Sequence, residues 1–133
     1  MTTTINTQSR EFVDVDFVFG KQPVTSNLSI KKGNNSVKQS ILNLLKLKTG
    51  DKPFHPEIKS PIYDYLFENA SVIVQVVIEG EVRKYLNAYE PRVFINTVKV
   101  SFPDPNTIKC NITGIMVNTS EPFNVTILID RLR

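Results

Sequence analysis

The stretch YLNAYEPRV, residues 85–93, separates two parts of the sequence that differ in hydrophobic period. Before it, apolar residues recur at helical spacing, and after it they alternate with polar residues. Pro91 lies at the change. Its ring fixes φ, removes a backbone donor and disfavours helical backbone at the preceding residue. We therefore predict that a helix ends just before Pro91 and that a strand begins just after it.

Glu90 and Arg92 flank this proline. If both are extended, their side chains project to the same side of the chain, because strand side chains repeat every two residues. Two interpretations remain open: a surface ion pair worth about 0–1 kcal/mol, or a rigid pair of charges that grips a partner. With either one, replacing Glu90 or Arg92 by alanine is expected to leave the fold near its normal stability.

Composition indicates one soluble globular domain with an ordinary surface. The chain has 133 residues, of which 41% are hydrophobic and 22% charged, enough for a single core. The net charge of +3 is scattered, and no basic run is longer than Lys31-Lys32. This distribution predicts no nucleic-acid partner.

Chemistry that depends on cysteine and histidine clusters is also excluded. Cys110 is the single cysteine and His55 the single histidine, so neither an internal disulfide nor a zinc cluster of these residues can form. Cys110 alternates with isoleucines, which predicts a buried small side chain. The longest apolar run, residues 72–78, is too short to cross a membrane, and residues 1–10 lack a secretory signal. We expect no metal, no cofactor, no membrane partner and synthesis in the cytoplasm.

The N-terminal third is predicted to hold little regular structure. Residues 1–10 form a polar arm, and residues 21–33 are irregular apart from a short extended piece at 28–30. Between them the alternation predicts one half-buried strand that ends at Gly20. Its inward residues are Val13, Val15, Phe17 and Phe19.

The next segment predicts an amphipathic helix. Asn35 or Ser36 is the expected N-cap, and Gly50 the expected C-terminal stop. The apolar stripe at i, i+4, i+7 and i+8 consists of Val37, Ile41, Leu44 and Leu45.

Residues 51–60 are predicted to form a stiff connector, because Pro53 and Pro56 exclude a helix. Phe54, between the prolines, is the expected apolar anchor of this connector in the core. A second helix is predicted to begin at Ser60-Pro61 and to end near Asn69. Its common face consists of Ile62, Tyr65 and Leu66.

Residues 71–88 carry conflicting signals. Residues 72–78 are rich in β-branched side chains, which favour a strand. Apolar residues nevertheless keep a helical spacing from Val74 to Tyr89, although Gly80 costs a helix about 1 kcal/mol. The longer pattern favours a helix.

After Pro91 the alternation predicts a three-stranded antiparallel sheet with turns at 103–106 and 118–122. Gly114 interrupts the middle strand, and we expect a bulge there. The inward residues of the three strands are Val98, Val100 and Phe102, then Ile108, Cys110 and Ile112, then Phe123, Val125, Ile127 and Ile129. The fold class is α+β, with helices packed on a small antiparallel C-terminal β-sheet and an N-terminal strand or arm in residues 1–36; residues 37–133 form the main domain.

Three short motifs occur in a fixed order: PFHPE at 53–57, LFEN at 66–69 and YEPR at 89–92. In combination they resemble the baseplate wedge and sheath-initiator family of contractile-tailed phages, which also occurs in the baseplates of type VI secretion systems. The resemblance covers residues 37–132. At Lys59 the chain departs from the family, which commonly has glycine there, so a left-handed turn at that position is in doubt.

The resemblance implies a structural protein of the baseplate inner ring that joins wedge proteins and nucleates the tail sheath. Glu90, Pro91 and Arg92 would contact the helical core bundle of the wedge proteins. The C-terminal sheet would pair with strands of the sheath protein, through Phe123, Asn124, Val125, Thr126 and Ile127. The motif residues with an expected structural role are Pro53, Phe54, Pro56, Glu57, Leu66, Phe67 and Glu68. Tail-tube or hub proteins are further candidate partners, and the location would be the virion tail baseplate, assembled in the host cytoplasm.

An enzyme is the alternative, because the family sometimes carries a lysozyme label. Glycoside hydrolysis needs two carboxyl groups at a defined separation, one with a raised pKa. The available carboxyl groups are Glu57, Asp64, Glu68 and Glu90, and the sequence places no two of them in one cleft. We predict no catalytic residues; a tail-associated peptidoglycan hydrolase remains the alternative function.

Overall fold

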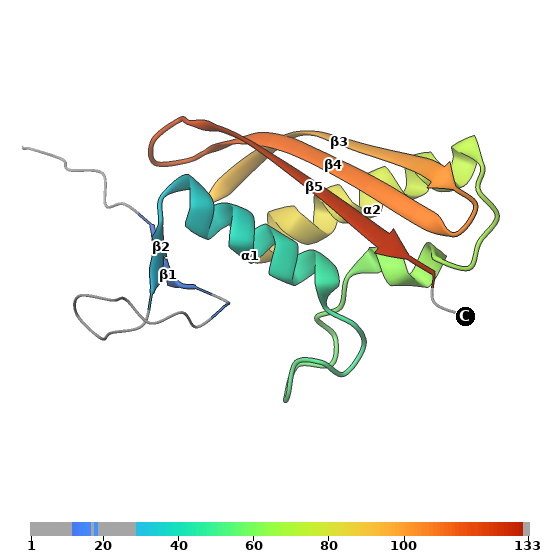
Figure 1. The fold of residues 1–133 in the computed structure, drawn as a ribbon, viewed down its shortest axis with the longest axis horizontal. Coiled ribbons are helices and arrows are strands. Elements are labelled where there is room, and N and C mark those ends of the chain that lie inside the picture. Colours follow the sequence, from blue (N-terminus) through green and yellow to red (C-terminus); the bar gives the residue numbers. More distant parts are fainter. Residues whose placement is uncertain (1–11, 17, 19–28, 132–133) are drawn as a thin grey trace, which may run out of the picture.

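The computed structural model describes residues 12–16, 18 and 29–131. Two long helices, α1 and α2, lie along one face of a three-stranded sheet (Figure 1). The α+β prediction is confirmed. The elements in chain order are β1 (Val13–Val15), β2 (Ile30–Lys32), α1 (Asn34–Lys46), the 3-10 helix η1 (Pro61–Tyr65), α2 (Val72–Tyr89), β3 (Val93–Asp104), β4 (Thr107–Met116) and β5 (Pro122–Asp130).

The helix α2 confirms that the long apolar stripe outweighs the local β-propensity of its first turns. Ser71 caps its start, because the Ser71 Oγ accepts a hydrogen bond from the Val74 N–H at 3.3 Å. Ile78, Val82 and Leu86 are fully buried along one face. The helix ends at Tyr89, and Glu90 leaves the helical region with φ −126° and ψ 79°, as Pro91 requires.

The helix α1 has the predicted apolar face, but both of its ends differ from the predicted ones. Val37, Ile41 and Leu45 are fully buried. The N-cap is Gly33 rather than Asn35 or Ser36, and no side chain caps this end; Ser36 Oγ instead donates to the Gly33 carbonyl at 2.8 Å. The helix ends at Lys46, so Gly50, at φ 85°, belongs to a turn of the connector.

The second predicted helix is shorter than expected. Only the five residues of η1 are helical, and Ser60 precedes them without a side-chain cap. Ile62 and Leu66 are buried and Tyr65 is half-buried, so the predicted apolar face is present. The chain turns away after Leu66 to enter α2, which leaves no room for helix up to Asn69.

The sheet is the predicted antiparallel meander, in the order β3-β4-β5. Its bulge lies on β3 rather than at Gly114: Ile95 pairs with Gly114, Thr97 pairs with Thr113, and Asn96 is the extra residue. Inward positions on β3 therefore change from odd to even numbers across Asn96. The strand β4 keeps its alternation of inward and outward side chains through Gly114. Glycine is needed at this position because β3 passes close to it: a Cβ atom there would lie 2.3 Å from the Phe94 carbonyl oxygen.

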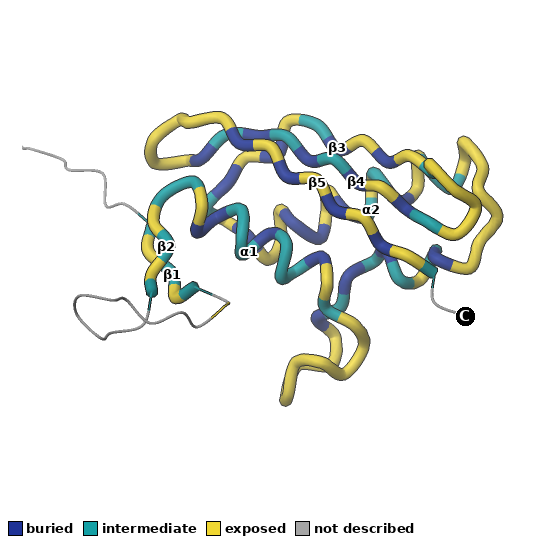
Figure 2. The backbone as a smooth tube through the Cα atoms, in the orientation of Figure 1, coloured by how far each residue is buried: buried dark blue, intermediate teal, exposed yellow. Residues whose placement is uncertain are grey.

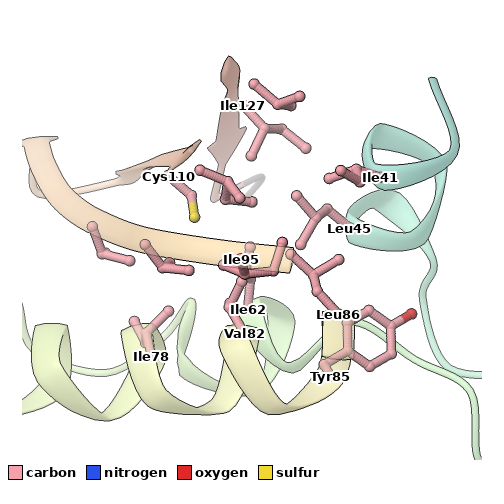
Figure 3. Close-up of a cluster of buried hydrophobic side chains, with 14 of the residues drawn as sticks. Ile41, Leu45, Ile62, Ile78, Val82, Tyr85, Leu86, Ile95, Cys110 and Ile127 are labelled. Carbon is pink, nitrogen blue, oxygen red and sulfur yellow. The ribbon is translucent and has the colours of Figure 1, made fainter. Parts of the chain in front are cut away.

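The core fills the space between the two helices and the inner face of the sheet (Figures 2 and 3). The helix α2 packs against β3, and α1 packs against β5. Each buried aliphatic side chain contributes about 1.5–3 kcal/mol. Cys110 is fully buried as predicted, and burial raises the pKa of its thiol to about 12. Other core residues from the sheet are Val93, Ile95, Val98, Val100, Ile108, Ile112, Met116, Phe123, Val125, Ile127 and Ile129.

The N-terminal strand faces the opposite way from its prediction. The two-stranded sheet of β1 and β2 packs on α1, and Ile30 of the expected extended piece begins β2. Val13 and Val15 are about half-exposed, whereas Asp14 between them turns toward the body and binds Arg92. The predicted inward face is therefore wrong, because an ion pair fixes the orientation of this short strand. Phe17, Phe19, Gly20 and the arm 1–10 lie outside the described residues.

We predict that Gly114→Ala lowers the free energy of unfolding by about 1–3 kcal/mol, because the added methyl group overlaps the Phe94 carbonyl and the Phe123 ring. Gly80→Ala is the matched control. Gly80 lies in α2 with open space around it, so alanine there should raise stability by up to about 1 kcal/mol. Urea denaturation measures both changes, and equal stabilities of the two variants would contradict this account of the sheet.

Candidate functional site

Glu90 and Arg92 face the same side of the chain, as predicted, and form a two-point ion pair. Arg92 Nε donates to Glu90 Oε1 at 2.6 Å, and Arg92 Nη2 donates to Glu90 Oε2 at 3.0 Å. Glu90 is only 2% exposed, while Arg92 is partly buried and Pro91 between them is exposed. Such a planar, two-point contact is available to arginine and not to lysine.

Two other segments join this pair. Ser40 of α1 donates its hydroxyl hydrogen to Glu90 Oε2. Asp14 of β1 accepts a hydrogen bond from Arg92 Nη1 at 3.0 Å. The Arg92 guanidinium also lies 5.4 Å from the centre of the Phe12 ring. We call Asp14, Ser40, Glu90 and Arg92 the polar cluster; it links β1, α1 and the turn between α2 and β3.

The ionisation of the polar cluster follows from these contacts. Burial alone raises the pKa of Glu90, but hydrogen bonds from Arg92 and Ser40 outweigh it, so the pKa of Glu90 is lowered. The hydrogen bond to Glu90 raises the pKa of Arg92. Both groups are therefore charged at neutral pH, in a site where removal of one partner leaves the other uncompensated.

The interpretation of an exposed ion pair is consequently wrong. Because Glu90 is buried, we now expect loss of the pair to destabilise the fold, contrary to the expectation from the sequence. Sequence reasoning treated Glu90 as a surface carboxylate, whereas α1 covers it through Ser40. Glu90 offers no surface of its own to a partner. Tyr89, Pro91 and the partly exposed Arg92 side chain are the accessible part of the motif.

The first family motif is placed on the surface. Phe54 is 97% exposed, so its prediction as a core anchor is wrong; Ile58, which is buried, anchors the connector instead. Pro53, Pro56 and Glu57 are exposed, and Glu57 lies 3.0 Å from His55 Nδ1.

The second family motif divides between core and surface. Leu66 is buried as expected. Phe67, also expected in the core, is 62% exposed and lies under the Arg131 guanidinium at 4.7 Å. Glu68 is exposed. Leu66 and Ile62 already fill the site under the sheet, which leaves Phe67 outside.

The two edges of the sheet differ. On the β3 edge, the Val100 N–H donates to Glu79 Oε1 at 2.9 Å, and Arg83 Nη2 donates to the Asn96 carbonyl at 3.2 Å. Both side chains belong to α2. They occupy two of the backbone groups that an added strand would need, so α2 hinders strand addition at this edge.

The β5 edge is open over most of its length. The Met116 N–H donates to the Glu121 carbonyl, and the Arg131 N–H donates to the Asn106 carbonyl. Backbone groups alternate in direction along a strand, so these two bonds fix the pattern: Val125 and its odd-numbered neighbours in β5 bond to β4. Four residues of β5 therefore direct both their N–H and C=O groups to the edge: Asn124, Thr126, Leu128 and Asp130.

One end of this edge is covered. Asn34 Nδ2 donates to the Pro122 carbonyl at 3.1 Å. Beyond it, among the described residues, no side chain is bonded to the edge groups of Asn124, Thr126 or Leu128. Leu128 is also 60% exposed on the outer face of the sheet.

Two of the candidate carboxyl groups, Glu57 and Glu90, do not fit the general acid of glycoside hydrolysis. This acid needs a raised pKa. Glu90 has a lowered pKa, and Glu57 has a lowered pKa because of a backbone hydrogen bond and the His55 side chain. Within the described ranges, no three His, Cys, Asp or Glu side chains gather as a metal site. None of the described helices is long and apolar enough to span a bilayer.

Comparison with known sequences identifies one family. The family model described as "Baseplate wedge protein gp25" matches residues 31–121. Baseplate wedge protein gp25 of Enterobacteria phage T4 is 30% identical over 73 residues. That alignment covers 55% of this chain and 55% of the T4 protein, so it spans little more than half of the length of the relative.

Solved structures share the fold at low sequence identity. A Geobacter sulfurreducens protein named as a tail lysozyme has a TM-score of 0.67 and 22% identity, and the alignment covers 74% of this chain and 91% of that protein. A chain of the anti-feeding prophage baseplate has a TM-score of 0.63 and 18% identity, with 92% and 88% covered. A chain of the postcontracted pyocin R2 baseplate has a TM-score of 0.50 and 18% identity, with 84% and 96% covered.

We predict that Glu90→Gln lowers the free energy of unfolding at pH 7 by about 2–3 kcal/mol, because Arg92 loses its buried counter-charge but keeps Asp14. The pKa of Glu90 is lower in the folded state than its ordinary 4.5, so the carboxylate stabilises the fold above that pH. The difference between wild type and variant should shrink as the pH falls through 4.5 and below.

Glu81→Gln is the matched control, because Glu81 pairs with Lys84 on the exposed side of α2. It should change stability by less than about 1 kcal/mol at every pH. Urea denaturation between pH 3 and pH 7 distinguishes the two variants, and a Glu90→Gln variant that behaves like the control would show that the ion pair is not important for the fold.

Proposed function

Because this chain belongs to the baseplate wedge protein gp25 family, we propose that it is a structural, non-enzymatic protein of the baseplate inner ring, which joins wedge proteins and nucleates the tail sheath. The match of the family model over residues 31–121 establishes a contractile-tail baseplate family. The observation that carries the finer proposal is that the β5 edge is open while the opposite edge, on β3, is contacted by side chains of α2.

Strand addition suits the open edge. The outward N–H and C=O groups of Asn124, Thr126 and Leu128 can pair with an extended segment of another chain, which gives main-chain hydrogen bonds along the whole contact. We assign this edge to a strand of the tail sheath protein. This assignment divides the expected docking residues 123–127 into two groups. The backbone groups of the odd-numbered residues bond to β4, and those of the even-numbered residues face the partner strand.

The wedge contact is assigned to Pro91 and Arg92. Pro91 is exposed and stiff, and part of the Arg92 guanidinium is accessible. Glu90 contributes by holding the guanidinium in place from inside the fold. A partner at this surface gains from the fixed orientation of Arg92, because less ordering is needed on binding.

The N-terminal part is proposed to dock on the main domain, residues 37–133, rather than to fold alone. Asp14 binds Arg92, and Gln39 Nε2 donates to the Val15 carbonyl at 2.8 Å, so residues from 1–36 are tied to the main domain at two points. We place the protein in the tail baseplate of the particle, assembled in the host cytoplasm, with tail-tube or hub proteins as further neighbours.

We predict that Thr126→Pro leaves the domain folded and reduces sheath nucleation on baseplates by roughly tenfold. Proline removes one edge donor and places its ring where the added strand would approach, for a combined loss of about 1–2 kcal/mol per contact. Counting sheathed tails by electron microscopy after assembly with purified sheath protein measures the effect.

Two controls make the result specific. Thr126→Val keeps the donor and should nucleate sheath normally. Val125→Pro removes a donor to β4 at a buried position and should unfold the domain. A folded Thr126→Pro protein that nucleates sheath as well as wild type would exclude the β5 edge as the docking site.

A further inference from the structure

Phe54 is the most exposed large apolar side chain in the described part of the chain, at 97%. It lies in the connector loop, residues 47–60, which projects from the helical side of the molecule, away from the sheet (Figure 1). Its backbone has φ 66°, in the left-handed region that non-glycine residues rarely adopt. A bare aromatic ring and an unfavourable backbone conformation thus coincide at one residue.

The connector loop is held in a defined conformation. The Ser60 N–H donates to the Leu47 carbonyl at 2.9 Å and closes the base of the loop. The Lys48 N–H donates to Asp51 Oδ2 at 2.8 Å. The buried Ile58 side chain anchors the C-terminal part of the loop in the core. The ring is therefore presented on an ordered support, which lowers the ordering cost of any contact it makes.

The fold itself does not explain Phe54. The other exposed aromatic of the family motifs, Phe67, has the Arg131 guanidinium over its ring. No described side chain covers Phe54 in this way, and its left-handed backbone acts against stability. An exposed aromatic ring held on an ordered loop is suited to a contact with another molecule.

The charged residues of the connector loop indicate the chemistry of the surface that Phe54 would contact. Asp51 binds the Lys48 N–H, Glu57 pairs with His55, and Lys59 pairs with Asp64. Lys52, two residues before Phe54, takes part in none of the ion pairs among the described residues, although its charge adds to the backbone hydrogen bond and His55 in lowering the pKa of Glu57. One exposed aromatic ring and one ammonium group without an ion pair match an apolar socket with a carboxylate at its rim.

We propose that Phe54 is a docking knob that inserts into an apolar, acid-rimmed socket of another protein of the particle, with Lys52 contacting the rim. A bilayer is the weaker fit, because the loop offers a single apolar side chain and carries the acidic residues Asp51 and Glu57 nearby. The proposal rests on the baseplate assignment, and it adds a third contact to those of Arg92 and the β5 edge.

The test places the photo-cross-linker benzoylphenylalanine at position 54 in the full-length chain, within purified particles. Irradiation should give one discrete adduct with another particle protein, mapped by mass spectrometry to an apolar segment with a nearby Asp or Glu. The same cross-linker at Phe67 is the control and should not give that adduct. Adducts at many unrelated sites, or none, would overturn the proposal.

Two substitutions complete the test. Phe54→Asn suits a left-handed backbone, so its melting temperature should equal or exceed that of wild type, while its incorporation into particles falls at least tenfold. Phe54→Leu keeps an apolar knob and should restore most of the incorporation. Lys52→Glu should reduce incorporation severalfold without a change in melting temperature.

The outcomes separate the possible errors. Normal incorporation of Phe54→Asn overturns the knob and leaves the baseplate assignment intact. Absence of the wild-type chain from particles overturns both the docking role of Phe54 and the baseplate assignment. Co-sedimentation of the wild-type chain with phosphatidylglycerol vesicles, abolished by Phe54→Asn, would replace the protein socket by a membrane surface.

Discussion

The fold depends on a buried ion pair that spans a single proline. Pro91 ends α2 and begins β3, and Glu90 and Arg92 on either side of it bind each other through two hydrogen bonds. Ser40 brings α1 to this pair, and Asp14 brings β1. The turn at which the chain changes from helix to sheet is therefore also the point that holds the N-terminal segments. A partner that contacts Arg92 contacts a group on which the positions of α1 and β1 depend.

The second constraint is the position of α2 beneath β3. It places Glu79 and Arg83 against one edge of the sheet, where they bind Val100 and Asn96. α1 lies against β5 and reaches only the Pro122 end of that edge. The domain thus has one edge at which α2 hinders uncontrolled pairing and one that can accept a strand, which is the arrangement an assembly protein needs.

Most of the fold can be predicted from the sequence, because the period of apolar residues is a local property. The stripe of α2, the end of that helix at Pro91 and the alternation of Val125, Ile127 and Ile129 all have this origin. Burial of Glu90 could not be predicted, since Ser40 lies 50 residues from it and only the tertiary fold brings them together. The exposure of Phe54 could not be predicted either, because its position also depends on the tertiary fold. Phenylalanine is usually a core residue, but in this loop Ile58 occupies the buried position. The bulge expected at Gly114 is on the facing strand, and Gly114 itself allows the close approach of the Phe94 carbonyl.

We propose that the open edge of β5 receives a strand of the sheath protein while α2 hinders pairing at the β3 edge. A cryo-EM map of the assembled tail before contraction would show this strand. We expect a fourth strand, from the sheath, hydrogen-bonded to Asn124, Thr126 and Leu128, with Glu79 and Arg83 still bound to β3. A sheath strand paired to β3, or a β5 edge without a strand in the complete tail, would contradict it.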